Sequence, residues 1–506
     1  MRKPIARASL SMAIARLKKR DPSTLKDADC VRCRHVIAMM GFVCVLVLYT
    51  LKVNLAVAIV AMVKQPLKNT TGSAAPSACP SAYSEEEEFQ VSDVELRDGE
   101  FEWDESTQGL VLSAFYYGYV STQLLGGMAA IRWGGKMVVG PAVALAGVIS
   151  AMGPVAARNG GAGPLIAVRV LQGAALGTGV DLWMAGDLGW GGVGGGLVDF
   201  TIHLGTVIGM TLSAWLVELG GWPQVFYFFG AVGVLFLVPW WLFVYDTPEE
   251  HPRISEAESE FLLRTLVNSK VDGECKSPPV PWAAILTCPS VWAIAVVHTG
   301  YAWVLFTFVN GLPTYMKNVL NYNIEKSAFL ASLPYLLQWF TSSASGILSQ
   351  WLREKGIVSH LTAYRLMNGI FLLGSAASLL AITFLGCSYV PIIAMLCLYG
   401  VLGGMFYGGS YLNHMDIAVN YSGILSGINQ TLSSLAGVVA PIVRGQLTQG
   451  KETLTQWNVV FYIAVGISVG SYLIFHFFGS VEEQPWNKPK MADPEKPAEQ
   501  TETTRF

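Results

Sequence analysis

Apolar residues in this chain are gathered into twelve long runs, separated by charged, polar or glycine- and proline-containing segments. A helix needs about 20 mostly apolar residues to cross the hydrocarbon core of a bilayer, and the runs have about this length. The pattern therefore predicts an all-α membrane protein with twelve transmembrane helices. The predicted spans are 36–63, 107–130, 137–157, 163–185, 197–217, 223–245, 290–312, 327–350, 361–386, 390–412, 422–447 and 457–479.

The composition supports a membrane protein and excludes several other classes. Of the 506 residues, 52% are hydrophobic and 14% are charged, whereas soluble proteins carry about 25% charged residues. The net charge of −3 gives no indication of a nucleic-acid partner. Cys30 and Cys33 form one isolated CxxC, and a structural zinc site needs further ligands. We find no nucleophile–base set and no metal-ligand cluster, so we expect neither an enzyme nor a bound cofactor or metal.

The distribution of basic residues predicts the orientation of the chain in the membrane. Residues 1–35 form a basic tail with ten Lys and Arg, whereas the loop at 64–106 carries three against eleven Asp and Glu. The positive-inside rule places the basic tail in the cytosol and the acidic loop in an organelle lumen or outside the cell. Twelve spans return the C-terminal tail, 480–506, to the cytosol. Asn69 starts an Asn-Thr-Thr sequence in the acidic loop and is the predicted glycosylation site.

A polar linker at 246–289 divides the chain into two six-helix halves, 36–245 and 290–479. The linker contains a predicted amphipathic helix, which begins with a capping box formed by Ser255 and Glu258. Each half also has a similar hairpin after its second span, GGMAAIRWGGKM at 126–137 and SGILSQWLREKG at 345–356. Two copies of a six-helix unit, with the substrate near the midplane between them, are the plan of major-facilitator transporters.

Two cationic residues lie inside predicted spans, where a charge costs about 2.5–3.5 kcal/mol on insertion scales. Lys52 is near the centre of the first span, and Arg169 is inside the fourth. The alternative is that each side chain snorkels to the membrane surface, but Lys52 is too central for this to be favourable. Two cations that face a central cavity attract an anion, and an arginine can bind a carboxylate or phosphate through two hydrogen bonds. We therefore predict that Lys52 and Arg169 bind an anionic substrate.

Aromatic residues on the same spans are further candidates for the substrate site. Tyr49, Tyr117 and Tyr301 place hydroxyl groups on the first, second and seventh spans. The alternative for each is packing or an interfacial aromatic belt. His298 lies one turn before Tyr301, and a packed neutral histidine is the competing interpretation there.

Several longer motifs resemble one known family. They are LKVNLAVAIVAMV (51–63), FEWDESTQGLVLSAFYYGYVSTQLLGG (101–127), GWPQVFYFFGAVGV (221–234), YDTPEEHPRISEAE (245–258), LPTYMKNVL (312–320), NHMDIAVNYSGILSGINQT (413–431) and FGSVEEQPWN (478–487). Over residues 35–488 the chain resembles the anion:cation symporter family of the major facilitator superfamily. This family includes sialin, the vesicular glutamate transporters and the type I sodium–phosphate cotransporters.

The resemblance implies an alternating-access carrier in which basic residues on helices one and four bind the anion. These positions correspond to Lys52, where the family usually has arginine, and to Arg169. The vesicular glutamate transporters add an arginine on helix seven and a histidine on helix two, where this chain has Tyr301 and Leu112. The chain is therefore more similar to the sialin and phosphate-cotransporter branch.

The fourth span departs from the family pattern, which has an acidic residue two turns after the arginine as the proton-coupling group. Gln172 and Leu176 stand where carboxylates are expected, and the glycine-rich stretch that follows is a few residues short. Asp181 is a coupling candidate, but it lies five residues beyond Leu176, about 7.5 Å along the helix and on another face. Either the usual coupling group is lost or residues 177–200 reflect a gene-model error, which we favour because the motifs resume at LGTVIGM. If coupling resides on another helix, His298 is the first candidate.

The sequence thus predicts a secondary active transporter of small organic or inorganic anions, such as sialic acid, phosphate or related carboxylates. We expect coupling to H+ or Na+, a monomeric protein, and a location in the plasma membrane or in a lysosomal or vesicular membrane. The alternative is a membrane sensor or scaffold that has the same fold but does not transport. Retained Lys52 and Arg169 argue against that alternative, and the altered fourth span argues for it.

Overall fold

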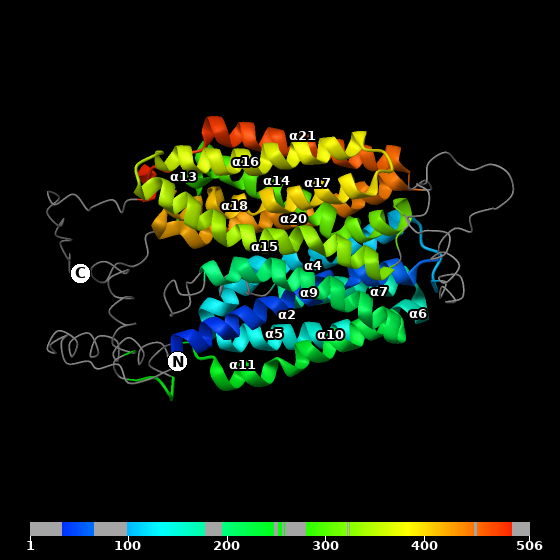
Figure 1. The fold of residues 1–506 in the computed structure, drawn as a ribbon. Coiled ribbons are helices and arrows are strands. Elements are labelled where there is room, and N and C mark those ends of the chain that lie inside the picture. Colours follow the sequence, from blue (N-terminus) through cyan, green and yellow to red (C-terminus); the bar gives the residue numbers. More distant parts are fainter. Residues whose placement is uncertain are drawn as a thin grey trace, which may run out of the picture.

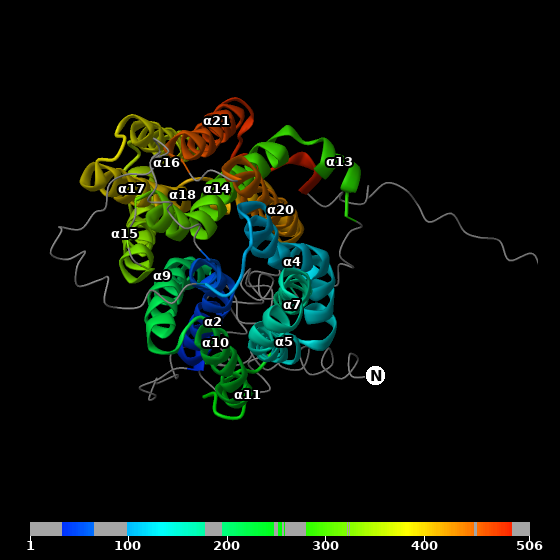
Figure 2. The same cartoon turned by 90° about the vertical axis from the view of Figure 1, so that its right-hand side faces the viewer.

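The computed structural model describes residues 33–64, 99–177, 195–246, 251–255, 258, 280–320, 322, 324–449 and 453–487. These residues are almost entirely helical, and their helices lie roughly parallel in two bundles, one above the other in Figure 1. Viewed along the helices in Figure 2, the first half of the chain (blue to green) forms one bundle and the second half (green to red) forms the other.

The helices of the first bundle are α2 (Cys33–Met62), α4 (Glu105–Trp133), α5 (Gly135–Ala151), α6 (Gly153–Gly160), α7 (Ala162–Leu176), α9 (Gly195–Gly220), α10 (Pro223–Leu235) and α11 (Leu237–Phe243). Those of the second are α13 (Trp282–Thr287), α14 (Pro289–Thr314), α15 (Ile324–Glu354), α16 (His360–Phe384), α17 (Tyr389–Gly403), α18 (Met405–Gly408), α19 (Asn413–Ile417), α20 (Ser422–Thr448) and α21 (Leu454–Phe478). A π-helical turn at Tyr315–Val319 continues α14, and 3-10 turns occur at Ser410–Leu412, Val419–Tyr421 and Pro485–Asn487.

Each of the twelve predicted spans overlaps one of these helices or a consecutive pair of them within the described residues. Eight helical segments of the described chain are long and apolar enough to cross a membrane, and α7 is a shorter apolar helix. The remaining three, α4, α15 and α20, are more polar. They lie between the bundles, where α4 packs along α20 and α15 packs along α9. A helix that faces the other bundle needs less apolar surface than one that faces lipid. The fourth predicted span, 163–185, is described only to residue 177.

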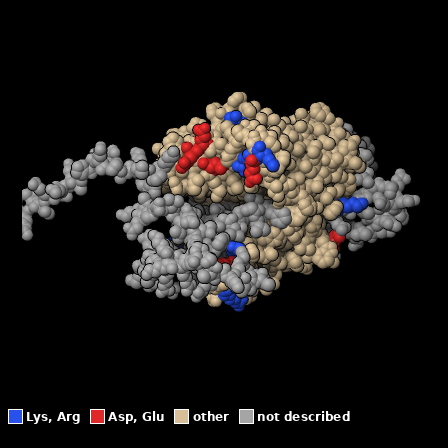
Figure 3. Space-filling model, turned by 60° about the vertical axis from the view of Figure 1, so that its left-hand side comes forward, with Lys and Arg blue, Asp and Glu red and all other residues tan. Residues whose placement is uncertain are grey.

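The outer surface has the distribution of charge that a bilayer requires. Figure 3 shows a wide uncharged belt, with Lys, Arg, Asp and Glu side chains toward its two ends. Many large apolar side chains of the helices are exposed on the surface. In water such a surface would be unfavourable, but lipid chains cover it without cost. Exposed examples are Leu145, Trp215, Phe384 and Phe477.

The two ends of the molecule can be distinguished by chain direction. We call the end where α2 begins and α21 ends the tail side, and the opposite end, where α2 ends and α4 begins, the loop side. At the loop side the two bundles touch: Gln449 Nε2 donates to Asp104 Oδ2 at 3.0 Å, and Lys317 Nζ donates to the Val60 carbonyl at 2.9 Å. These contacts join the second bundle to α4 and α2 of the first.

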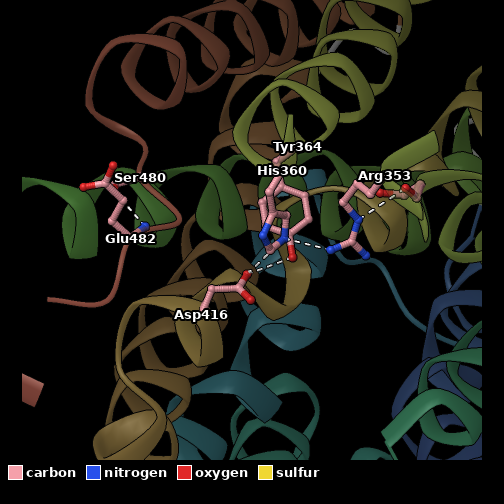
Figure 4. A network of polar contacts seen from close by, with 7 residues as sticks. Arg353, His360, Tyr364, Asp416, Ser480 and Glu482 are labelled. Carbon is pink, nitrogen blue, oxygen red and sulfur yellow. Dashed lines mark hydrogen bonds and ion pairs between the residues drawn. The ribbon is translucent and has the colours of Figure 1, made fainter. Parts of the chain in front are cut away.

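The similar hairpins of the two halves are both tied down at the tail side. In the first half, Gly134 has a φ of 92°, and the Lys136 amide donates to Asp246 Oδ1 at 2.8 Å. In the second half, Asp416 Oδ2 accepts from the Tyr364 hydroxyl at 2.8 Å and lies 3.7 Å from His360 Nε2. Arg353 joins this network through a 2.8 Å contact between its Nη1 and His360 Nε2 (Figure 4). Each hairpin is therefore held near a carboxylate from a later part of the chain, Asp246 at the start of the linker and Asp416 in the second half.

The start of the linker is bound to the first helix. Glu258 accepts hydrogen bonds from the amides of Cys33 (2.9 Å) and Arg34 (3.0 Å), and thereby satisfies the free donors at the start of α2. The Glu258 amide donates to Ser255 Oγ at 3.3 Å, which is one half of the predicted capping box. The apolar residues of the predicted amphipathic helix lie outside the described residues.

Candidate functional site

Lys52 lies near the middle of the membrane among aromatic rings. It is about ten residues, or roughly 15 Å, before the loop-side end of α2, and its side chain is only 8% exposed. The ammonium nitrogen lies 5.0 Å from the ring centre of Tyr49, one turn earlier on the same helix. Four further rings surround it at similar distances: Phe115 at 6.0 Å, Tyr116 at 5.1 Å, Tyr119 at 5.2 Å and Phe306 at 4.9 Å. A cation over the faces of aromatic rings is stabilised by their quadrupoles.

Arg169 is buried beside Lys52 and bound to the main chain of α2. Its side chain is 2% exposed. Nη1 donates to the Leu51 carbonyl at 3.4 Å and to Gln172 Oε1 at 2.8 Å, and Nη2 donates to the Lys52 carbonyl at 3.2 Å. Gln172 Nε2 also donates to Leu51 O, at 3.3 Å. All these acceptors are neutral. No carboxylate contacts Arg169, and its Nε has no hydrogen-bond partner, among the residues that the structure describes.

Close packing of α4 against α7 places one aromatic ring against both cations. Phe115 on α4 lies 5.1 Å from Arg169 Cζ, so its ring contacts both cations. Glycines make this approach possible: a Cβ at Gly118 would overlap the Val170 carbonyl, and a Cβ at Gly173 would overlap the Phe115 carbonyl. Small residues at such positions let membrane helices approach closely.

We expect Gly173→Ala to lower the stability of the protein, by about 1–3 kcal/mol, because the new methyl group forces the α4 and α7 backbones apart. Thermal unfolding of the purified protein in detergent measures the effect. Gly163→Ala on the same helix is the matched control, since nothing lies within 4 Å of the added Cβ there. Equal melting temperatures for the two variants would contradict the packing argument.

The aromatic rings around Lys52 come from both halves of the chain. Phe306 lies on α14, and its ring centre is 4.7 Å from that of Tyr116 on α4. Tyr116 in turn packs against Gly437 of α20, because a Cβ at Gly437 would meet the Tyr116 ring at 2.5 Å. The cations thus belong to the first half, while part of their surroundings belongs to the second. A relative movement of the two halves changes the environment of the charge.

Of the other predicted substrate ligands, only Tyr49 lies beside Lys52. Tyr49 contacts Lys52 as described, whereas Tyr117 is 47% exposed on the outer face of α4 and is not brought into the group. Tyr301 is buried in the second half: its hydroxyl lies 3.2 Å from that of Tyr407 and accepts from Gln338 Nε2 at 3.1 Å.

Of the coupling candidates and the glycosylation site, only His298 lies within the described residues. His298 is buried within the second half, with Nε2 3.4 Å from the Ser410 carbonyl and its ring stacked on Tyr411 at 5.8 Å. Asp181 and Asn69 lie outside the described residues, so their predictions stay untested.

Two kinds of residue near the site were not predicted from the sequence. Phe115 and Phe306 flank the cations, but a phenylalanine in an apolar run carries no distinguishing signal. His203 on α9 is fully buried, and it could have been found as an ionisable residue inside a span. Its ring meets the Tyr407 ring edge-on, with centres 5.6 Å apart.

Comparisons with known proteins all indicate the same superfamily of transporters. The family model described as Major Facilitator Superfamily matches residues 37–441. Sialin from Homo sapiens is 37% identical over 468 residues, which cover 90% of this chain and 91% of sialin. A Drosophila melanogaster protein named for inorganic phosphate cotransport is 34% identical, covering 94% and 90% of the two chains. Vesicular glutamate transporter 2 from Bos taurus is 30% identical, covering 92% and 77%.

Solved structures share the architecture at low identity. A bacterial homologue of the human lysosomal transporter Spinster, in an inward-facing and occupied conformation, has a TM-score of 0.60 at 12% identity. The alignment covers 88% of this chain and 96% of that one. A D-xylose–proton symporter also has a TM-score of 0.60, at 13% identity and 88% and 98% coverage. These similarities confirm the predicted twelve-helix fold of the major facilitator superfamily.

Proposed function

This chain belongs to the Major Facilitator Superfamily, in the family of sialin and the vesicular glutamate transporters, and we propose that it carries small organic or inorganic anions that bind at Lys52 and Arg169. It is a secondary active transporter and not an enzyme, because the members of this family are transporters. Its higher identity to sialin and to the phosphate cotransporter relative than to the glutamate transporter agrees with the branch predicted from the sequence.

The observation that best supports an anionic substrate is the uncompensated charge of Arg169. A buried guanidinium normally has a carboxylate partner, yet the described contacts of Arg169 are two main-chain carbonyls and one amide. Lys52 adds a second positive charge beside it, surrounded by rings. In a medium of low dielectric constant, two neighbouring cations attract an anion strongly. A carboxylate or phosphate group supplies the missing negative charge.

The arrangement of the two halves supports alternating access. The contacts of Asp104 with Gln449 and of Val60 with Lys317 join the halves at the loop side. In this proposal, substrate exchanges with the tail side in this state. Opening to the loop side requires these contacts to break, and the ring of Phe306 then moves relative to Lys52 because the two residues belong to different halves. The coupling ion in this proposal is H+ or Na+, and one polypeptide forms the complete translocation path.

Transport itself is tested by purified protein in liposomes, with labelled phosphate, sialic acid, glutamate and urate supplied under imposed pH and sodium gradients. We expect saturable uptake of at least one of these anions and no uptake of uncharged sugars. If none of the anions is taken up and none stabilises the protein against heat, the chain acts as a sensor or scaffold instead.

The tail side is assigned to the cytosol in this proposal, and the loop side to an organelle lumen or the extracellular space. The basic tail of residues 1–35 supports this orientation through the positive-inside rule. Cys387 lies in the loop-side turn between α16 and α17 and is disulfide-bonded. Disulfides persist in oxidising compartments such as the lumen of secretory organelles and the cell exterior. The protein then resides in the plasma membrane or in a lysosomal or vesicular membrane.

We expect Asn69 to carry a glycan and both termini to be cytosolic. Glycosidase treatment should raise the electrophoretic mobility of the wild type and leave Asn69→Gln unchanged. Epitope tags at either terminus should resist protease added to intact cells and become sensitive after permeabilisation. A terminal tag cleaved from outside intact cells contradicts the orientation.

A further inference from the structure

His203 on α9 is a buried ionisable residue that the proposed anion site does not use. Its side chain is 0% exposed, and neither Nδ1 nor Nε2 has a hydrogen-bond partner among the described residues. A neutral imidazole carries one donor and one acceptor, and buried polar groups without partners are rare. An ionisable residue inside a membrane span is functional by default.

The position of His203 links it to both halves of the transporter. Its ring meets Tyr407 of α18, in the second half, edge-on at 5.6 Å. Two residues further along α9, Gly205 abuts α2 of the first half, where an added Cβ would lie 2.9 Å from Tyr49 Cβ. Tyr49 is the residue whose ring lies 5.0 Å from Lys52 Nζ. His203 therefore lies between the halves, near the level of the anion site.

Tyr407, whose ring contacts His203, begins a chain of polar contacts within the second half. The hydroxyl of Tyr407 lies 3.2 Å from that of Tyr301, which accepts from Gln338 Nε2 at 3.1 Å. His298, by contrast, has its Nε2 bonded to Ser410 and its ring stacked within one half. Of His203 and His298, His203 is the one whose surroundings must change when the halves separate.

We propose that His203 is the proton-coupling residue of this carrier, so that one imidazole nitrogen binds the transported proton; this rests on the proposed anion transport. The described part of α7 holds no carboxylate, so no acidic group there can bind the proton. Histidine is the side chain whose charge ordinarily changes between about pH 5 and 8. The proton enters from water on one side and returns to water on the other, with only an N–H bond formed and broken.

The present state disfavours a charged imidazole, because both ring nitrogens would be donors without acceptors in a buried place. When the halves separate, water reaches the ring and can hydrate the imidazolium. Protonation and conformation are thereby coupled. The titratable or charged residues on the elements packed against α9 are Cys33, Arg34, His35, Cys44, Tyr49 and Lys52 on α2, Glu325, Lys326, Tyr335, Arg353 and Glu354 on α15, and Tyr227 on α10. Tyr407 of α18 contacts the His203 ring, and Asp199 lies one turn earlier on α9, where its side chain is outside the described part.

The test compares two modes of transport by full-length protein in liposomes, with labelled phosphate and sialic acid as probes. Counterflow exchanges labelled for unlabelled anion and needs no net proton movement, whereas gradient-driven accumulation does. We expect the counterflow rate of His203→Gln to stay within twofold of wild type. We expect its proton-driven accumulation to be at least tenfold lower than that of wild type. Unchanged accumulation overturns the proposal, and so does an equal loss of counterflow, because that result indicates substrate binding or misfolding.

Two control variants separate His203 from other histidines. His476→Gln alters a half-buried histidine near the end of α21, bonded to Tyr472, and should leave both transport modes unchanged. His298→Gln should also keep proton-driven accumulation. If His298→Gln loses accumulation while His203→Gln keeps it, the coupling residue is His298.

A measurement without transport distinguishes failure of this inference from failure of the proposed function. Nitrogen NMR of histidine-labelled protein in nanodiscs follows the protonation of each ring, and the His203 signal is identified by its loss in His203→Gln. We expect this signal to titrate between pH 5 and 8 only in a population that is open to water. A His203 ring that stays neutral at every pH and in every population overturns the proposal even if anion transport is established.

Discussion

Replacing Lys52 with methionine is expected to lower anion uptake by roughly 30-fold or more, the usual result of truncating one member of a buried charge pair. Methionine keeps the apolar stem that packs among Tyr49, Tyr116 and Phe306, but it removes the positive charge. Lys52→Ala should have at least as large an effect. The initial rate of labelled anion uptake into liposomes, normalised to folded protein, measures the loss.

Lys52→Arg is the informative companion variant, because it keeps the charge over the same rings. We expect it to retain transport, because the anion:cation symporter family that the sequence resembles usually has arginine at this position. Lys355→Ala removes a lysine from the exposed tail-side hairpin and should leave uptake unchanged. Normal uptake by both Lys52→Ala and Lys52→Met would rule out Lys52 as an anion ligand.

Replacing Arg169 with alanine should strongly lower uptake and also loosen the contact between α7 and α2. The guanidinium donates to the carbonyls of Leu51 and Lys52, so its loss leaves both acceptors without that donor. We expect uptake to fall by roughly 30-fold or more through loss of the anion's partner. Because arginine binds through a planar fork that lysine cannot reproduce, Arg169→Lys should fall between wild type and alanine.

Arg158→Ala is the matched control for Arg169. Arg158 lies on the exposed loop side, where its Nη2 is 2.7 Å from Glu100 Oε1, and exposed ion pairs contribute only about 0–1 kcal/mol. This bond to Arg158 lowers the pKa of the Glu100 carboxyl from its usual value. Uptake by Arg158→Ala should stay within about twofold of wild type. Retained anion-dependent thermal stabilisation in Arg169→Ala would show that the anion binds elsewhere.

The sequence alone determined the features that depend on local patterns. Hydropathy located all twelve spans because a membrane helix must be apolar along its length, whatever its neighbours are. Lys52 and Arg169 were found for the complementary reason, since a charge stands out inside an apolar run. The altered fourth span was also visible from the sequence, at Gln172 and Leu176.

Only the tertiary structure decided which faces of these helices meet. Arg169 bonds to a carbonyl 118 residues away, and no local pattern specifies that contact. Tyr116 and Tyr117 are equivalent in hydropathy, yet one approaches Lys52 and the other is exposed, because adjacent residues point in different directions around a helix. The same holds for His203: its place between the halves results from the packing of α9 on α2 and α15. Helix formation is a local property of the chain, whereas a site built from several helices depends on their packing.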